Sequence, residues 1–271
     1  MGKINVLDKH VAELIAAGEV VERPSSVIKE LVENAVDAGA TVLTVEIKNG
    51  GTTFMRVTDN GCGIAREDVP VAFLRHATSK VKVQDDLENT PRSGSAGRRW
   101  LPLRRWRMEL LTRTADELAG THYVISGGEE ECCEDAGCAQ GTTFVVRDLF
   151  YNTPARMKFL KKDVTEANAV AAVMDRLALS HPEVSVRFIR DGKETLHTPG
   201  DGKLKSAIYA VFGKSLPPVD AGGIRLQRVE VSGFVSKPNA RPNRSMQHFP
   251  QRPLCKEPDR DGRLERPLKA P

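Results

Sequence analysis

Apolar residues recur at helical spacing between residues 27 and 40, and this pattern predicts an amphipathic helix. Pro24 suits the first helical position and Gly39 suits the end. The stripe that would face a core consists of Val27, Ile28, Leu31, Val32 and Ala35. The opposite face carries three carboxylates and one amide, spaced i, i+3, i+4 and i+7: Glu30, Glu33, Asn34 and Asp37. Such a face is either solvated surface or part of a site.

A period of two follows the helix and predicts a β-hairpin. Thr41–Lys48 alternates as a strand, Asn49-Gly50-Gly51 is a turn signal, and Phe54–Thr58 is the return strand. The hairpin leads into the run Asp59-Asn60-Gly61-Cys62-Gly63. Its glycines permit positive φ or a close approach of the backbone to a planar ligand, and Asp59 is placed to accept a hydrogen bond from an exocyclic amine.

The same run is compatible with a calcium loop or a plain turn. A calcium loop needs further oxygen ligands, and Ala65 and Arg66 stand where such ligands are required. We therefore set calcium aside. Further along the chain, the pattern predicts a strand from Gly141, a helix over Glu166–His181, a strand over Val184–Ile189 and a helix over Lys203–Val211. The run from Pro217-Pro218 to Gly222-Gly223 is a candidate linker, and a strand over Leu226–Val235 is predicted after it.

Composition is that of an ordinary soluble protein of one large or two modest domains, with 271 residues, 40% apolar and 28% charged. The formal charge of +4 permits a nucleic-acid partner without establishing one. The sequence contains no 18-residue apolar run and no basic-then-apolar leader, so we expect no membrane span and no secretory signal. Five cysteines at irregular spacing indicate reduced thiols in a cytoplasm.

Three of these cysteines, Cys132, Cys133 and Cys138, cluster in what we expect to be an acidic loop. A metal site there is disfavoured, because the sequence shows no second ligand pair with a histidine partner.

Three stretches together resemble the MutL family of DNA mismatch-repair ATPases: residues 16–40, residues 59–80 and residues 141–160. That family shares the GHKL ATP-binding fold with gyrase, the large heat-shock chaperone and the sensor histidine kinases. The resemblance covers residues 1–89 and 109–249. It implies a two-layer α/β sandwich of the GHKL type over residues 1–217, followed by the beginning of a second α/β domain over residues 218–271.

The resemblance also implies roles for single residues. Glu30 would be the general base for water attacking the γ-phosphate, and Asn34 would hold Mg²⁺. Asp59 would accept a hydrogen bond from the adenine amine. The other positions implied in ATP binding are Asp37, Gly61, Gly63, Thr78 and Thr142. Independently of the resemblance, Glu30 and Asn34 lie one helical turn apart, so both can face one phosphate chain.

The resemblance implies that ATP binding joins two copies and that hydrolysis releases them. This cycle would link recognition by MutS to a downstream nuclease or helicase on DNA. The implied location is the bacterial cytoplasm, at the nucleoid. Two alternatives stay open. One is a damaged or truncated fragment that acts at most as a binding module. The other is a different GHKL enzyme, such as a topoisomerase subunit or a kinase, although the run Phe150–Arg156 is typical of MutL.

The chain departs from the family at residues 90–107. There the family has a glycine-rich lid of the form G-F-R-G-E-A-L, whose amides cradle phosphates, and this chain has an Arg-rich run with both tryptophans. We chose GC-rich codons for residues 93–106 and read them in a neighbouring frame. The result is G-F-R-G-E-A-L-A-S-I-A-A-V, which restores the lid motif. Residues 250–271 likewise depart from the family sequence and resemble it when suitable codons are read in a shifted frame. We therefore predict a frameshift, which sequencing of the gene would test.

A rival interpretation of the Arg-rich run is a nucleic-acid patch. If the printed chain is the one made, we expect poor ATP binding and little hydrolysis. The family's second-domain lysine and its C-terminal dimerisation domain are not identified in this chain.

Overall fold

One eight-stranded sheet organises the computed structural model, which describes residues 23–73, 107–151, 157–213, 219–226 and 229–236. The strand order is β5-β4-β3-β6-β2-β1-β7-β8. Every described pairing in this sheet is antiparallel except that of β1 with β7. The strands are β1 (Val42–Lys48), β2 (Phe54–Asp59), β3 (Arg107–Arg113), β4 (Gly120–Ser126), β5 (Glu129–Ala136), β6 (Gly141–Arg147), β7 (Ser185–Arg190) and β8 (Lys193–His197).

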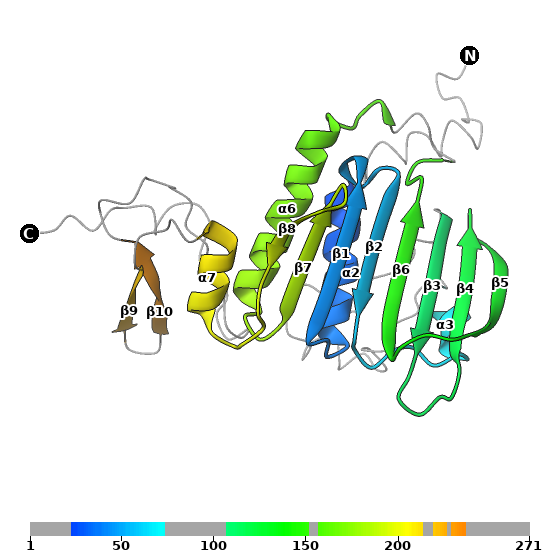
Figure 1. Ribbon diagram of the computed structural model, residues 1–271, viewed down its shortest axis with the longest axis horizontal. Helices are drawn as coiled ribbons and strands as arrows, with labels where there is room; N and C mark the ends of the chain where they lie inside the picture. The colour runs from blue at the N-terminus through cyan, green and yellow to red at the C-terminus, as the bar shows by residue number, and fades with distance from the viewer. Residues whose placement is uncertain (1–22, 74–106, 152–156, 214–218, 227–228, 237–271) are drawn as a thin grey trace, which may run out of the picture.

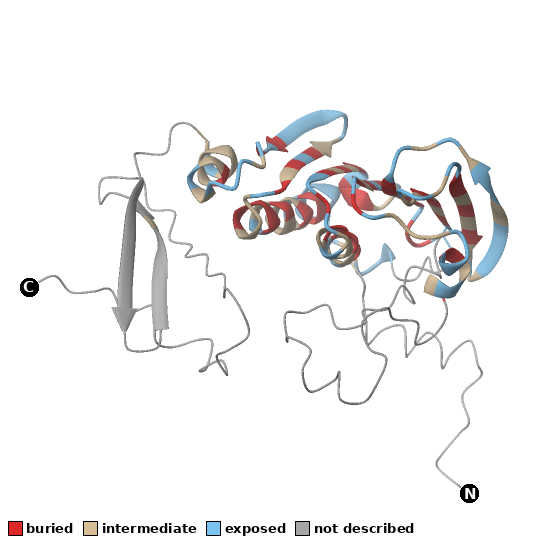
Figure 2. Ribbon diagram, turned by 90° about the horizontal axis from the view of Figure 1, so that it is seen from below, coloured by how far each residue is buried: buried red, intermediate tan, exposed pale blue. Residues whose placement is uncertain are grey.

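Helices α2 (Pro24–Asp37) and α6 (Asp163–Ser180) cover one face of this sheet, as Figures 1 and 2 show. Helix α7 (Leu204–Phe212) packs against α6 and β8. The short helix α3 (Asp68–Ala72) follows the loop after β2. Alternate strand residues point into the core between the layers, for example Leu43, Val45 and Ile47 of β1, each 0% exposed. The α/β sandwich predicted from the sequence is therefore confirmed.

Helix α2 forms as the apolar pattern predicted. Pro24 occupies its first turn, where a missing N–H costs nothing, and Gly39 lies just beyond its end with φ +75°. All five residues of the predicted stripe are buried, at 3% exposure or less. Burial of a stripe of this size, at about 1.5–3 kcal/mol per large side chain, is what holds α2 on the sheet.

The hairpin and three later elements also match their predictions. Strands β1 and β2 pair in register, from Leu43 opposite Asp59 to Lys48 opposite Phe54. A 3-10 turn, η1 (Asn49–Gly51), joins them, and its three residues all have positive φ. Helix α6 begins three residues earlier than predicted, while β7 and α7 match within one residue at each end.

Two sequence predictions were wrong. Gly222 and Gly223 are not a linker, because both lie in β9 (Val219–Leu226), which pairs with β10 (Val229–Ser236) as a separate two-stranded sheet. Pairing with β10 overrides the local signal of the two glycines, since an extended backbone is open to glycine as well. Cys132 and Cys133 do not lie in a loop but in strand β5, which the acidic sequence concealed.

Other predictions fall outside the described residues, namely residues 90–106 of the Arg-rich run, the segment 250–271, Thr78 and the Pro217-Pro218 pair, while Arg107 begins β3. The division into domains 1–217 and 218–271 stays a prediction. Among the helices described, none has the length and apolar character needed to cross a bilayer.

Candidate functional site

The polar face of α2 is half-buried where the resemblance places catalysis. Glu30 and Asn34 have intermediate exposure, and Asp37 is exposed. Glu33 forms an ion pair with Lys29 one turn back, 3.7 Å between Oε1 and Nζ. The Nδ2 atom of Asn34 is buried and has no hydrogen-bond partner among the described residues. A buried N–H donor without a partner is costly, so Nδ2 of Asn34 is a candidate to donate to a ligand acceptor.

Asp59 ends strand β2 on the side of the sheet that faces the helices. Its exposure is 8%, and it alternates with the buried Met55 and Val57. The backbone N–H of Gly61 donates to its Oδ1 at 2.8 Å. Burial raises the pKa of the Asp59 carboxyl above 3.8, and backbone hydrogen bonds from Gly61 and Thr142 oppose that rise. The Asp59 carboxylate is therefore a hydrogen-bond acceptor with a fixed orientation and little contact with solvent.

The loop after Asp59 is fastened to the end of α2. The Oδ1 of Asn60 accepts the backbone N–H groups of Thr41, at 2.9 Å, and Val42, at 2.8 Å. The backbone N–H of Cys62 donates to the carbonyl of Ala38 at 3.0 Å. The loop after Asp59 is therefore hydrogen-bonded to Ala38, which ends α2, and to the start of β1.

Thr142 stands opposite Asp59 in the pairing of β2 with β6. Its hydroxyl lies 3.2 Å from that of Thr112 on β3, which in turn donates to the carbonyl of Gly141 at 3.1 Å. Thr112 also accepts the backbone N–H of Ile64 at 2.9 Å, so it holds the far end of the loop. Sequence analysis missed Thr112, because β3 follows the aberrant run and carries no motif of its own.

The two glycines of the loop serve different purposes. Gly63 has φ +75°, and a Cβ there would lie 2.2 Å from the carbonyl oxygen of Arg113. At Gly61 a Cβ would lie 2.8 Å from the carbonyl oxygen of Ala38. Gly63 is needed for its backbone conformation and for a close approach to β3. Gly61 is needed for a close approach to the end of α2. The sequence predicted positive φ or a close approach to a ligand for these glycines. Gly63 has the positive φ, and the close approaches that the structure shows are to backbone.

A glycine pair provides a matched test of this packing. We expect Gly63→Ala to destabilise the fold more than Gly39→Ala, because both have φ +75° but a Cβ at Gly39 meets nothing within 4 Å. The shared left-handed strain costs about 1–2 kcal/mol, and the clash at Gly63 adds about 1–3 kcal/mol. Urea unfolding of both variants measures the difference. Equal losses would contradict the close approach to Arg113.

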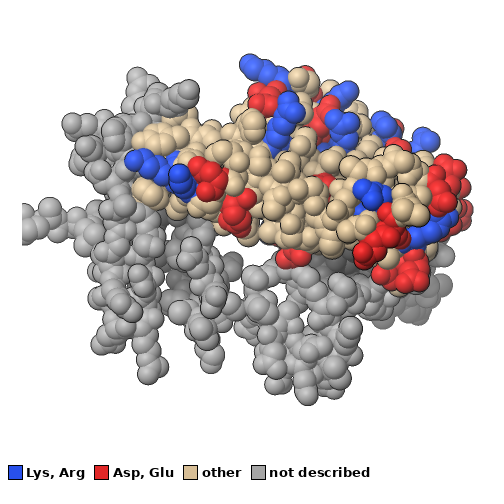
Figure 3. All heavy atoms as spheres, turned by 60° about the horizontal axis from the view of Figure 1, so that its bottom comes forward, with Lys and Arg blue, Asp and Glu red and all other residues tan. Residues whose placement is uncertain are grey.

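Charges of both signs are mixed on the face of the molecule that Figure 3 shows. Figure 3 shows Lys and Arg interspersed with Asp and Glu over the described residues, with acidic side chains gathered at the end of the sheet where β5 lies. The face in view therefore presents no continuous basic surface among the described residues.

Taken together, α2, the loop after β2 and strand β6 bring most predicted site residues to one region: Asn34, Asp37, Asp59, Gly61, Gly63 and Thr142. Glu30 lies one turn further back on α2, and Thr78 lies outside the described residues. Chemically, this region offers a carboxylate acceptor for an amine, an unsatisfied amide and a half-buried carboxylate that could hold a proton.

Comparison with known proteins gives one matching family model and a set of similar sequences. The family described as "Histidine kinase-, DNA gyrase B-, and HSP90-like ATPase" matches residues 19–147. The chain is 47% identical over 255 residues to the DNA mismatch repair protein MutL of Agathobacter rectalis, covering 92% of the chain and 39% of that relative. For MutL of Symbiobacterium thermophilum the figures are 44% identity, 92% and 40%. The chain thus spans about two fifths of the length of these relatives.

Solved structures give the same result. The Aquifex aeolicus MutL ATPase domain complexed with ADP aligns with a TM-score of 0.64 and 31% identity, covering 82% of this chain and 80% of that one. A second structure of the Aquifex aeolicus MutL ATPase domain aligns with a TM-score of 0.61 at 31% identity, covering 80% and 74%.

Proposed function

We propose, from the premise that this chain belongs to the MutL family of DNA mismatch-repair proteins, that residues 1–217 bind ATP with Mg²⁺ in the manner of its ATPase domain. Hydrolysis then depends on Glu30. The observation that supports this best is the buried Asp59 carboxylate, held at a strand end by the backbone N–H groups of Gly61 and Thr142. A carboxylate so fixed is suited to accept the exocyclic amine of adenine, which specifies the base.

The side chains on α2 divide the remaining work. Asn34 would hold Mg²⁺ through its amide oxygen, a ligand type that Mg²⁺ accepts, and the ion would supply positive charge to the phosphates. The buried Nδ2 of the same amide is a donor and would face an acceptor, not the ion. Glu30 would take a proton from the water that attacks the γ-phosphorus as the bond to the leaving oxygen breaks. Asp37, Gly61, Gly63, Thr78 and Thr142 complete the nucleotide site in this proposal.

The activity of the whole protein is a wider proposal. ATP binding would bring two copies together and hydrolysis would release them, coupling MutS to a downstream nuclease or helicase on DNA in the bacterial cytoplasm. A second candidate function is a binding module without turnover. The sequence of residues 90–107 favours it, because the glycine-rich lid motif is missing there.

Nucleotide titration of matched aspartate variants tests the site. We expect Asp59→Asn to weaken ADP binding about tenfold, since a charge-assisted hydrogen bond exceeds a neutral one by about 1.4 kcal/mol. Asp175→Asn is the control, because Asp175 is another part-buried aspartate whose pKa burial raises, and it lies on α6. It should bind ADP normally. Equal affinity for all three proteins would contradict the role of Asp59.

The pKa of Asp59 gives an independent pH prediction. Since burial raises that pKa above 3.8, the carboxyl takes up a proton more readily in the folded chain than in the unfolded one. Nucleotide affinity should fall as the pH drops through the raised pKa, whereas the contribution of Asp59 to folding stability should rise. ADP titration and urea unfolding over one acid pH series measure both. In Asp59→Asn the additional pH dependence should disappear from both measurements.

A further inference from the structure

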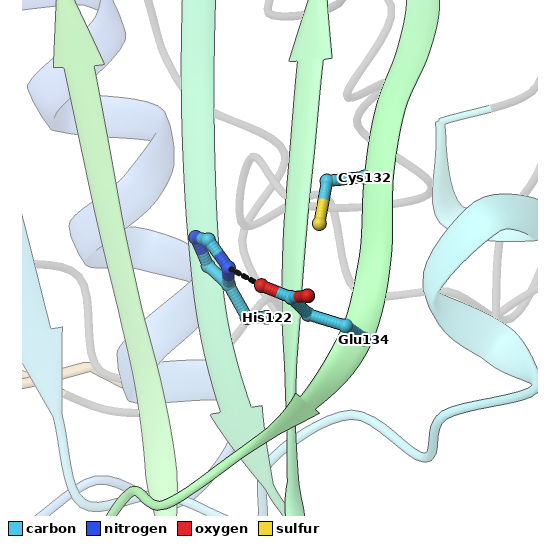
Figure 4. A group of neighbouring side chains, drawn as sticks. All are labelled: His122, Cys132 and Glu134. Carbon is cyan, nitrogen blue, oxygen red and sulfur yellow. Dashed lines mark hydrogen bonds and ion pairs between the residues drawn. The ribbon is translucent and has the colours of Figure 1, made fainter.

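A group of side chains of the types that ligate metals lies on the other face of the sheet, away from the proposed nucleotide site. His122 of β4 and Cys132 and Glu134 of β5 lie within reach of one another, and their ligand atoms are all within 4.8 Å. Figure 4 shows the imidazole, the sulfur and the carboxylate on adjacent strands. His122 and Cys132 are half-buried, and Glu134 is exposed.

Strand register places these ligands together. Glu134 stands opposite His122, and Cys132 stands opposite Val124, so the two β5 ligands are two residues apart and share a face. The Nδ1 of His122 lies 3.2 Å from Oε1 of Glu134. A bulge interrupts the pairing next to Val124, and bulges re-aim side chains beside functional sites.

The second ring nitrogen of His122 also has a carboxylate partner. Its Nε2 lies 3.1 Å from Oε1 of Glu109 on β3, on the side away from Glu134. A carboxylate on the second imidazole nitrogen is the arrangement that metal-ligating histidines use, because it fixes the tautomer and raises the basicity of the ligating nitrogen. Glu109 would thereby leave Nδ1 of His122 free for an ion.

We propose that His122, Cys132 and Glu134 form a mononuclear site for a zinc-type divalent ion, with Glu109 as its supporting carboxylate. An imidazole, a thiolate and a carboxylate are ligands that Zn²⁺ accepts, and three protein ligands leave one position for water. Ligand atoms on one zinc ion are about 3.3–3.7 Å apart. His122 Nδ1 and Glu134 Oε1 already lie 3.2 Å apart, so the remaining contraction would come from the side chain of Cys132. On binding, the thiol releases its proton to solvent as the sulfur–metal bond forms. The ion would then join the edge strand β5 to β4.

Cobalt titration of the full chain, after removal of metals with a chelator, tests this site. We expect a sulfur-to-cobalt charge-transfer band that saturates at one ion per chain and is displaced by Zn²⁺. Cys132→Ser should lose the band. Cys133→Ser is the matched control, since Cys133 is the next residue, stands opposite buried Tyr123 and packs against the core on the other side of β5. It should keep the band.

Two further variants separate a site from a folding defect. Glu109→Gln should lower zinc affinity about 10–100-fold while the band persists at saturation. His122→Asn should abolish saturable binding with an unchanged circular dichroism spectrum. The proposal fails if wild type shows no charge-transfer band, or if the band survives in Cys132→Ser. Neither result depends on ATP, so the nucleotide proposal stands or falls separately.

Discussion

Replacing residues 90–107 with the family's glycine-rich run, including G-F-R-G-E-A-L, is expected to raise ATP affinity about 100-fold. Backbone amides of such a run donate to phosphate oxygens, and hydrogen bonds to charged groups contribute about 1.5–3 kcal/mol each. Two of them at the lower limit correspond to about 100-fold in dissociation constant. The affinity is measured by titration of the printed chain and the restored chain side by side, with the same nucleotide and Mg²⁺ concentration.

A scrambled insert of the same composition is the control, because it restores glycine content without the order of the motif. Its affinity should match that of the printed chain. If the restored and printed chains bind ATP equally, the Arg-rich run is not a damaged lid. In that case an increase in DNA affinity attributable to residues 90–107, lost when its arginines are replaced, would favour the nucleic-acid interpretation. Sequencing of the coding DNA across this region tests the frameshift itself.

The sequence predicts those parts of the fold in which apolar residues recur at a regular helical or strand spacing. Helix α2 and strands β1 and β2 combine uninterrupted apolar periods with Pro24, Gly39 and the Asn49–Gly51 turn, so local preference and tertiary burial agree. The predicted relation of α2 to Asp59 came from the resemblance to the MutL family, since apolar periods alone do not bring a helix and a strand end together. The position of the loop after β2 could be predicted because it follows a strand end and contains Gly61 and Gly63.

The other half of the sheet was beyond sequence reasoning. Strand β5 reads EEECCEDA, with three consecutive acids, because it is an edge strand largely exposed to solvent. Its partner β4 contributes His122, which lies ten residues before Cys132 along the chain. Only the antiparallel register brings those side chains together, so their spacing in sequence matched no metal motif. Thr112 was missed for a related reason, since its role comes from hydrogen bonds to two residues of β6 and to Ile64 in the loop after β2.

In the lid-restored chain, Glu30→Gln is expected to reduce the rate of ATP hydrolysis about 10²–10⁴-fold, the usual contribution of a positioned general base. Glutamine keeps the size and polarity of Glu30 but cannot take the proton from water. Since Asp59 and Asn34 are unchanged, ATP affinity should stay within a few fold of the parent. Phosphate release at saturating ATP and equilibrium titration measure the two quantities independently.

Glu33→Gln is the matched control, because Glu33 lies on the same helix three residues away and pairs with Lys29. Losing an i,i+4 ion pair costs only about 0.3–0.5 kcal/mol, so turnover should be nearly normal. Three results would each contradict the assignment of Glu30: parental turnover in Glu30→Gln, equal loss in both variants, or loss of binding together with turnover. Slow hydrolysis with intact binding would instead give a nucleotide-bound state that persists. If binding drives association of two copies, that variant should accumulate as a dimer with ATP and not with ADP.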